Sequence, residues 1–135
     1  NIALTRQIQL EFHPPARQLE VLADADGLRT ILNNLLANAI NYTLAGGRVT
    51  LTLSLDGDRV LFEVSDTGVG IAKEHQSRVF ERFYRVDKAR TRSVGGTGLG
   101  LAIVRHLVEV MQGEITLKSE LGEGSTFRVW LPQAP

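Results

Sequence analysis

The chain has 135 residues, 43% of them hydrophobic, which suits a single globular domain with a core of its own. Fifteen basic and fifteen acidic side chains give a formal net charge of zero, so the usual electrostatic footprint of a nucleic-acid-binding protein is missing. Without cysteine there are no disulfides or thiolate metal sites, and no apolar run approaches the roughly 18 residues of a membrane-spanning helix. We expect a soluble piece of a longer protein, since the chain starts without an initiator Met or a signal pattern.

Strand-like alternation marks four segments in the first half of the chain. Two short strands are expected at 8–12 and 18–23, separated by a Pro-Pro break. Apolar residues alternate with polar ones over 49–55 and again over 60–64, on either side of an Asp-Gly-Asp turn. This pattern predicts a hairpin with one buried face.

A long helix is predicted between these pairs of strands. Its apolar residues recur at the spacing of one helical face and are Leu28, Ile31, Leu32, Leu35 and Ala39. We expect the helix to run to about Tyr42, with Asp24 or Asp26 as its N-cap.

The second half predicts two more helices and a second pair of strands. Residues 72–84 suggest a short helix with an aromatic cluster, whereas 85–96 have no apolar period and predict a mobile loop. A helix is expected over 98–111, followed by paired strands near 115–117 and 127–131. The apolar face of this second long helix is expected to consist of Leu99, Ile103, Leu107 and Val110. The predicted architecture is a mixed sheet backed by helices.

Residues 95–104, GGTGLGLAIV, place four glycines in six positions at the start of a helix. Gly100 is followed by Leu and Ala, so this is no Walker A loop, and the preceding basic loop does not fit a dinucleotide-binding fingerprint. Glycines at a helix start let the backbone approach a polyphosphate, and the helix amides point at the anion. A flexible hinge before an ordinary core helix explains the same glycines equally well.

Three asparagines on the first long helix share a second face. Asn34, Asn38 and Asn41 are spaced by four and then three residues, so they lie beside one another and away from the apolar stripe. Asparagine is a poor helix former, but its amide oxygen suits Mg²⁺ that is held mainly by phosphate oxygens. We interpret this face as a candidate metal site.

Asp66 follows Val64 at the inward-facing parity of its predicted strand, just before the sequence DTGVGI. A buried carboxylate needs a hydrogen-bond partner. Asp66 either caps the glycine turn or accepts a hydrogen bond from the amine of a ligand.

Basic side chains crowd the loop just before the glycines; they are Arg85, Lys88, Arg90 and Arg92. Such a run is usually a solvated face, but beside a phosphate cradle it would clamp a polyanion.

Five motifs in this order, NNLLANAINYT, DTGVGI, FERFYR, GGTGLGLAIV and GEGSTF, resemble the N, G1, F, G2 and G3 boxes of the catalytic ATP-binding domain of sensor histidine kinases. The resemblance spans essentially the whole chain, and we interpret 1–135 as one such domain. It implies the α/β (α+β) sandwich of type II topoisomerases, chaperone ATPases and mismatch-repair ATPases. In this Bergerat-type fold, a mixed, mainly antiparallel sheet packs on about three helices and a mobile ATP lid, here 85–97, covers the nucleotide.

The resemblance also implies roles for individual residues. Asn38 would bind Mg²⁺ with Asn34 assisting, Asp66 would accept a hydrogen bond from the exocyclic amine of adenine, and Arg85 would reach the terminal phosphates. Many relatives carry Lys where this chain has Asn41, so that phosphate contact is absent or is supplied by Lys88, Arg90 or Arg92. Further nucleotide contacts are implied for Tyr42, Gly68, Gly70, Ile71, Gly96, Thr97, Gly98, Leu99, Gly100 and Thr126, although Thr126 also suits a plain turn.

None of the three histidines fits the phosphoacceptor of such kinases. His13 precedes a proline, which disfavours a helix, and His75 and His106 lack the acidic residue, Leu and Arg that follow the acceptor. We therefore expect the acceptor on a separate helical dimerisation domain, absent from this chain, that passes its phosphate to a response regulator. The isolated domain is expected to be a monomer in the cytoplasm, and the full-length protein a membrane-anchored homodimer.

The predicted activity is transfer of the γ-phosphoryl group of Mg-ATP to a histidine of that partner domain. The alternatives are a module that binds ATP only to switch shape, an ATP hydrolase, or a serine-directed kinase of the same fold. Hydrolysing relatives place a Glu four residues before the metal Asn, where this chain has Asn34, a neutral amide and a poor general base.

Overall fold

The computed structural model describes residues 8–14, 24–81 and 100–133. Their strands form one five-stranded sheet in the order β1-β2-β3-β5-β4, in which β1 is parallel to β2 and the other neighbouring pairs are antiparallel. The strands are β1 Gln9–His13, β2 Arg48–Asp56, β3 Arg59–Asp66, β4 Glu114–Glu120 and β5 Gly124–Pro132. The helices are α2 Ala25–Asn41, α3 Lys73–Gln76 and α5 Gly100–Val110.

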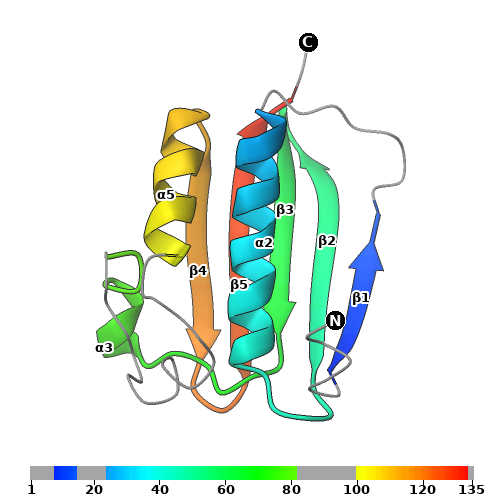
Figure 1. The fold of residues 1–135 in the computed structure, drawn as a ribbon, viewed down its shortest axis with the longest axis vertical. Helices are drawn as coiled ribbons and strands as arrows, with labels where there is room; N and C mark the ends of the chain where they lie inside the picture. Colours follow the sequence, from blue (N-terminus) through cyan, green and yellow to red (C-terminus); the bar gives the residue numbers. More distant parts are fainter. Residues whose placement is uncertain (1–7, 15–23, 82–99, 134–135) are drawn as a thin grey trace.

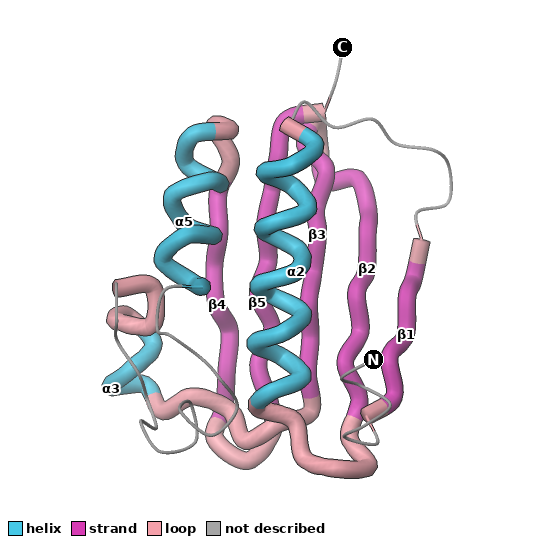
Figure 2. Tube along the Cα trace, in the orientation of Figure 1, coloured by secondary structure: helices cyan, strands magenta, loops and turns pink. Residues whose placement is uncertain are grey.

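Helices α2 and α5 lie side by side on one face of the sheet, as Figures 1 and 2 show. This arrangement confirms the predicted mixed, mainly antiparallel sheet backed by helices. The predicted strand at 18–23 and the predicted lid at 85–97 lie outside the described residues. In the described ranges, no helix is long and apolar enough to cross a membrane.

The core lies between the helices and the sheet and is built by the two expected periodicities. Alternate residues of β3 and β5 point toward the helices, and α2 contributes Ile31 and Leu35, both 0% exposed. Each fully buried side chain of this kind contributes about 1.5–3 kcal/mol of hydrophobic stabilisation. The core therefore holds the end of β3, which carries Asp66, in a fixed position relative to α2.

The start of α2 resolves the choice between two possible N-caps. Asp24 has an extended backbone, and its Oδ2 accepts a hydrogen bond from the backbone N–H of Gly27 at 2.8 Å. Asp26 already lies inside the helix, where its carboxylate forms an exposed pair with Arg29 at 3.2 Å. Asp24 is therefore the N-cap, since it satisfies one of the free N–H groups of the first turn.

Replacing Asp24 with Ala is expected to lower the free energy of unfolding by about 0.5–2 kcal/mol, because Gly27 loses its acceptor. Urea denaturation followed by circular dichroism measures the change. Asp24→Asn is the matched control, since it keeps an oxygen in the same place and should stay within about 0.5 kcal/mol of the wild type. Equal losses in the two variants would contradict the capping role.

The predicted apolar face of the second long helix is partly wrong. Ile103 and Val110 were expected to pack inward, but in α5 they are 42% and 65% exposed. Val104 and Val108, one position away from the expected stripe, are instead 0% exposed. Both sets have helical spacing, so α5 is rotated relative to the prediction and two large apolar side chains remain on its outer side.

Candidate functional site

Asp66, the last residue of β3, is a buried carboxylate that is only 9% exposed. Its Oδ1 accepts two backbone hydrogen bonds, from the N–H of Gly68 at 2.9 Å and from the N–H of Ser125 at 3.3 Å. Within the described residues, Oδ2 has no hydrogen-bond partner. Asp66 therefore caps the glycine turn with one oxygen and keeps the other available for a donor.

Burial raises the pKa of the Asp66 carboxyl above its ordinary value, because the charged form loses its hydration. The N–H groups of Gly68 and Ser125 lower the pKa and offset only part of this shift. A buried, half-satisfied carboxylate destabilises the folded chain unless a further donor approaches it. Such a carboxylate is typical of a binding site.

The turn that follows Asp66 joins the end of α2 to the β4–β5 hairpin. The N–H of Val69 donates to the carbonyl of Tyr42 at 3.1 Å, and the carbonyl of Val69 accepts from the N–H of Gly122 at 2.9 Å. The turn is thus fixed on both sides by backbone hydrogen bonds, which keeps Asp66 at a defined place between α2 and the hairpin.

Two of the predicted site glycines make this close packing possible. A Cβ at Gly68 would overlap the carbonyl of Tyr42, and a Cβ at Gly70 would overlap the carbonyl of Glu120. Gly70 also has a φ of 74°, a conformation that residues with a Cβ rarely adopt. Both glycines are therefore required by the shape of the turn, and a direct nucleotide contact for either stays a prediction.

The three asparagines of α2 lie on a half-buried side of the helix, as predicted from their spacing. Asn34 donates through Nδ2 to the carbonyl of Thr30 at 2.8 Å, and its Oδ1 lies 3.0 Å from the place of a Cβ on Gly100. Asn34 therefore lies against the first residue of α5. The side chain of Asn38 makes no hydrogen bond with the described residues, which leaves its amide available to a ligand.

These contacts connect several predicted residues along the second half of α2. In Figure 1 the lower ends of α2 and β3 are their C-terminal ends, and the lower end of α5 is its N-terminal end. Helix α2 is the common element, because it contacts the turn after Asp66 through Tyr42 and the start of α5 through Asn34. The site thus combines a buried carboxylate, a row of amides and a helix start.

Thr126 does not belong to this arrangement. Its hydroxyl lies 2.9 Å from that of Ser65, on the sheet face that is turned away from α2 and α5. The neighbouring Ser125 occupies the side of Asp66 instead. The nucleotide contact of Thr126 stays a prediction.

The other predicted contacts belong to the expected loop before α5 and to the glycine-rich segment that follows it. Arg85, Lys88, Arg90, Arg92, Gly96, Thr97, Gly98 and Leu99 all lie outside the described residues. Their roles stay predictions.

Three polar residues near Asp66 escaped the sequence analysis. Ser119, which is 8% exposed, contacts the hydroxyl of Ser125 at 2.8 Å and accepts a hydrogen bond from the N–H of Ile71 at 2.7 Å. Gln76 donates to the carbonyl of Ile71 at 2.7 Å. Together they surround the predicted site residue Ile71.

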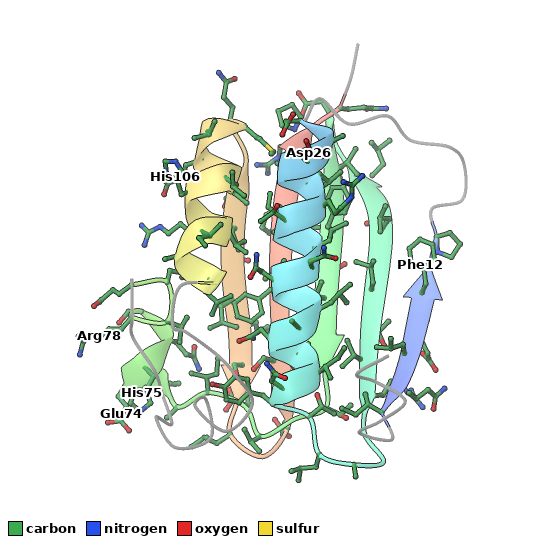
Figure 3. All side chains as sticks on the ribbon, viewed as in Figure 1. Phe12, Asp26, Glu74, His75, Arg78 and His106 are labelled. Atoms are coloured by element: carbon green, nitrogen blue, oxygen red, sulfur yellow. The ribbon has the colours of Figure 1, made fainter. Side chains whose placement is uncertain are left out.

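The histidines lie away from this site. His13 is on the edge strand β1, while Figure 3 shows His75 on α3 and His106 on the outer side of α5. Within the described residues, no group of three His, Cys, Asp or Glu side chains suits a metal ion.

This fold and site define an ATP-binding domain of the Bergerat type. The chain belongs to the family described as "Histidine kinase-, DNA gyrase B-, and HSP90-like ATPase", whose model matches residues 23–135.

Among curated relatives, the chain is 42% identical to the sensor histidine kinase RppB of Synechocystis sp. over 97% of this chain and 29% of the relative. It is also 42% identical to the sensor histidine kinase WalK of Bacillus subtilis, over 96% of this chain and 22% of the relative. The circadian input-output histidine kinase CikA of Synechococcus elongatus is 48% identical over 82% of this chain and 15% of its own length. The chain thus spans less than a third of each of these relatives.

Solved structures give the same result. Full-length ShkA in complex with AMPPNP superimposes with a TM-score of 0.85 at 40% identity, covering 98% of this chain and 27% of that one. The mycobacterial sensor histidine kinase MprB gives a TM-score of 0.83 at 29% identity, covering 99% of this chain and 88% of that one. The predicted fold and family are confirmed.

Proposed function

We propose that this chain binds Mg-ATP and transfers the γ-phosphoryl group to a histidine on a separate helical domain of the same longer protein. The family, the sensor histidine kinases among its relatives and the AMPPNP complex of ShkA support this activity. The observation that carries the proposal is the buried Asp66, one of whose carboxylate oxygens lacks a partner among the described residues.

Asp66 would recognise adenine. A carboxylate oxygen accepts a hydrogen bond from the exocyclic amine of adenine, whereas guanine has a carbonyl oxygen at the corresponding position and would face it with another acceptor. The low dielectric of the buried site strengthens both effects. The backbone hydrogen bonds to Oδ1 keep the carboxylate oriented without using Oδ2.

The amides of α2 fit a magnesium ion shared with the phosphates. Asn38 has a half-buried side chain without a partner in the described residues, and the Oδ1 of Asn34 faces the start of α5. Mg²⁺ prefers oxygen ligands and would neutralise charge on the phosphate oxygens when bound. We assign Asn38 as the metal ligand and Asn34 as its assistant.

The same residues favour phosphoryl transfer over ATP hydrolysis. Asn34 is a neutral amide whose nitrogen is held by the carbonyl of Thr30, so it offers no base that would activate water. The acceptor would therefore come from the partner domain, and the phosphate would pass onward to a response regulator. We further propose that this domain acts in the cytoplasm, without nucleic acid, as part of a membrane-anchored homodimer.

Incubation with γ-labelled ATP tests the proposal. The chain alone is expected to bind ATP, release phosphate very slowly and remain unlabelled, because it carries no suitable acceptor. Addition of the helical phosphoacceptor domain of the same protein should yield acid-labile label on histidine in that domain. A variant of the acceptor domain with Gln in place of its histidine is the control.

Three other results would contradict the proposal in different ways. Rapid phosphate release by the chain alone would favour a hydrolase, and acid-stable label on serine would favour a serine kinase. Tight ATP binding without any labelling of the partner would favour a nucleotide switch.

A further inference from the structure

Two side chains without a role in the proposed function hydrogen-bond the backbone N–H and the backbone carbonyl of Ile71. The hydroxyl of Ser119 accepts a hydrogen bond from the Ile71 N–H at 2.7 Å. The amide of Gln76 donates to the Ile71 carbonyl at 2.7 Å and to the Ser119 carbonyl at 3.1 Å. We call Ser119 and Gln76 together the Ile71 clamp.

The hydrogen-bonding capacity of Ser119 is fully used. A serine hydroxyl offers one proton and two lone pairs. Ser119 donates its proton to the carbonyl of Gly124 at 3.0 Å, so its lone pairs must serve the N–H of Ile71 and the hydroxyl of Ser125, 2.8 Å away. Ser125 is therefore the donor in the contact between the two serines, and its backbone N–H donates in turn to Asp66. One buried hydroxyl thus links both ends of the turn that begins at Asp66.

Gln76 uses its two amide protons in the same way. Both of its partners are carbonyl oxygens, so the NH₂ group of Gln76 must face them. A side chain of the same shape that only accepts hydrogen bonds, such as Glu, cannot replace Gln76. Gln76 lies on α3, whereas Ile71 precedes that helix and Ser119 belongs to β4. The clamp therefore ties the turn to two separate elements of the fold.

We propose that Gln76 and Ser119 are positioning residues for adenine recognition. They hold the turn after Asp66 in one conformation and thereby fix the direction in which Oδ2 of Asp66 meets the base. The inference rests on the proposed adenine role of Asp66. Binding is strongest when such groups are held in place before the ligand arrives, since no ordering is then needed.

Two variants of the 135-residue chain remove the clamp from opposite sides. Ser119→Ala deprives Ile71 of the acceptor for its N–H, and Gln76→Glu replaces the donor with a carboxylate that faces two carbonyl oxygens. Each variant is expected to lower the affinity for ATP about five- to tenfold, while the already weak GTP binding changes little. The ATP-to-GTP affinity ratio, measured by calorimetry, should fall by the same factor.

Two further variants serve as controls, and a third is a substitute test variant. Ser119→Thr keeps the hydroxyl and should restore the ratio to within about twofold of the wild type. Ser65→Ala removes a hydroxyl contact of similar length, 2.9 Å, from the other face of the sheet and should leave the ratio unchanged. Gln76→Met removes both donors without adding charge, and replaces Gln76→Glu if that variant does not fold.

Amide hydrogen exchange of the nucleotide-free chain gives an independent readout. The Ile71 N–H should exchange slowly in the wild type and in Ser65→Ala, and at least about tenfold faster in Ser119→Ala. Faster exchange at Ile71 with an unchanged ATP-to-GTP ratio would reduce the clamp to a structural role and overturn the proposal.

The results also separate this proposal from the one on which it rests. A wild-type chain that binds ATP and GTP equally would overturn the adenine role of Asp66, and with it the recognition role of the clamp. A wild-type chain that prefers ATP, together with clamp variants that keep the same preference, would overturn the positioning role alone.

Discussion

Replacing Asp66 with Asn is expected to weaken ATP binding about tenfold to over a hundredfold, the loss of a charged hydrogen bond worth about 1.5–3 kcal/mol. The Oδ1 of Asn still accepts the N–H groups of Gly68 and Ser125, so the turn is kept. The new NH₂ group takes the place of Oδ2 and would face the adenine amine with a second donor. Calorimetric titration with ATP and GTP measures the change.

The same variant is not expected to lose stability. Because burial raises the pKa of Asp66 in the folded chain, the carboxyl contributes most to stability when it is protonated. This contribution is present below the pKa of the unfolded chain and is lost as the pH rises through the raised pKa of the folded chain. At a pH above this raised pKa, Asp66→Asn removes the buried charge, so its free energy of unfolding should equal or exceed that of the wild type.

Acidification should lower ATP affinity, although it increases the contribution of Asp66 to stability. As the pH falls through the raised pKa of Asp66, protonation removes the charge that strengthens the hydrogen bond from the adenine amine and adds an O–H donor to the carboxyl. ATP affinity should therefore decrease in the wild type and less so in Asp66→Asn. Asp56→Asn is the matched control, since the Asp56 carboxylate accepts from the indole N–H of Trp130 at 2.7 Å, at the exposed end of β2. Unchanged ATP affinity in Asp66→Asn, or equal losses in the two variants, would refute the role of Asp66.

Strand alternation correctly predicted that the end of β3 is buried. The same alternation also predicts which residues at the start of β5 face inward. The parity of Val64 placed Asp66 inward, as the structure confirms. The same parity, counted back from the buried Phe127, places Ser125 inward and Thr126 outward. The motif resemblance drew attention to Thr126, although the period of two already excluded it from the side of Asp66.

Helical spacing was less decisive for α5. The expected stripe through Ile103 and Val110 and the observed one through Val104 and Val108 are both apolar at helical intervals. Periodicity identifies a helix with an apolar side, but it does not choose between two adjacent apolar stripes. That choice depends on packing against α2 and β4, which only the folded chain shows.

The Ile71 clamp was invisible in the sequence for a different reason. Ser119 lies 48 positions from Ile71, and its hydroxyl acts on a backbone N–H, so no residue pattern marks the pair. Gln76 is only five positions from Ile71, but its second acceptor belongs to β4. Side-chain contacts to distant backbone depend on tertiary structure rather than on local propensity.

Asn38→Ala provides the second large effect, because it removes the proposed metal ligand. In the presence of Mg²⁺ the variant is expected to bind ATP about tenfold to a hundredfold more weakly than the wild type, since an amide oxygen bound to a cation is replaced by a methyl group. In EDTA the same substitution should change the affinity by no more than about twofold, because a metal ligand matters only when the metal is present.

Two features of Asn38 make this comparison decisive. Its side chain is half-buried and makes no hydrogen bond within the described residues, so the substitution breaks no described hydrogen bond of the nucleotide-free chain. Alanine also favours the helix more than asparagine does, so α2 should not be weakened.

Asn33→Ala is the matched control, since Asn33 lies on the exposed side of the same helix. This variant should bind ATP like the wild type in both buffers. If Asn38→Ala lowers ATP affinity equally with and without metal, Asn38 has a structural role instead, because only a contribution made through Mg²⁺ disappears when the ion is removed.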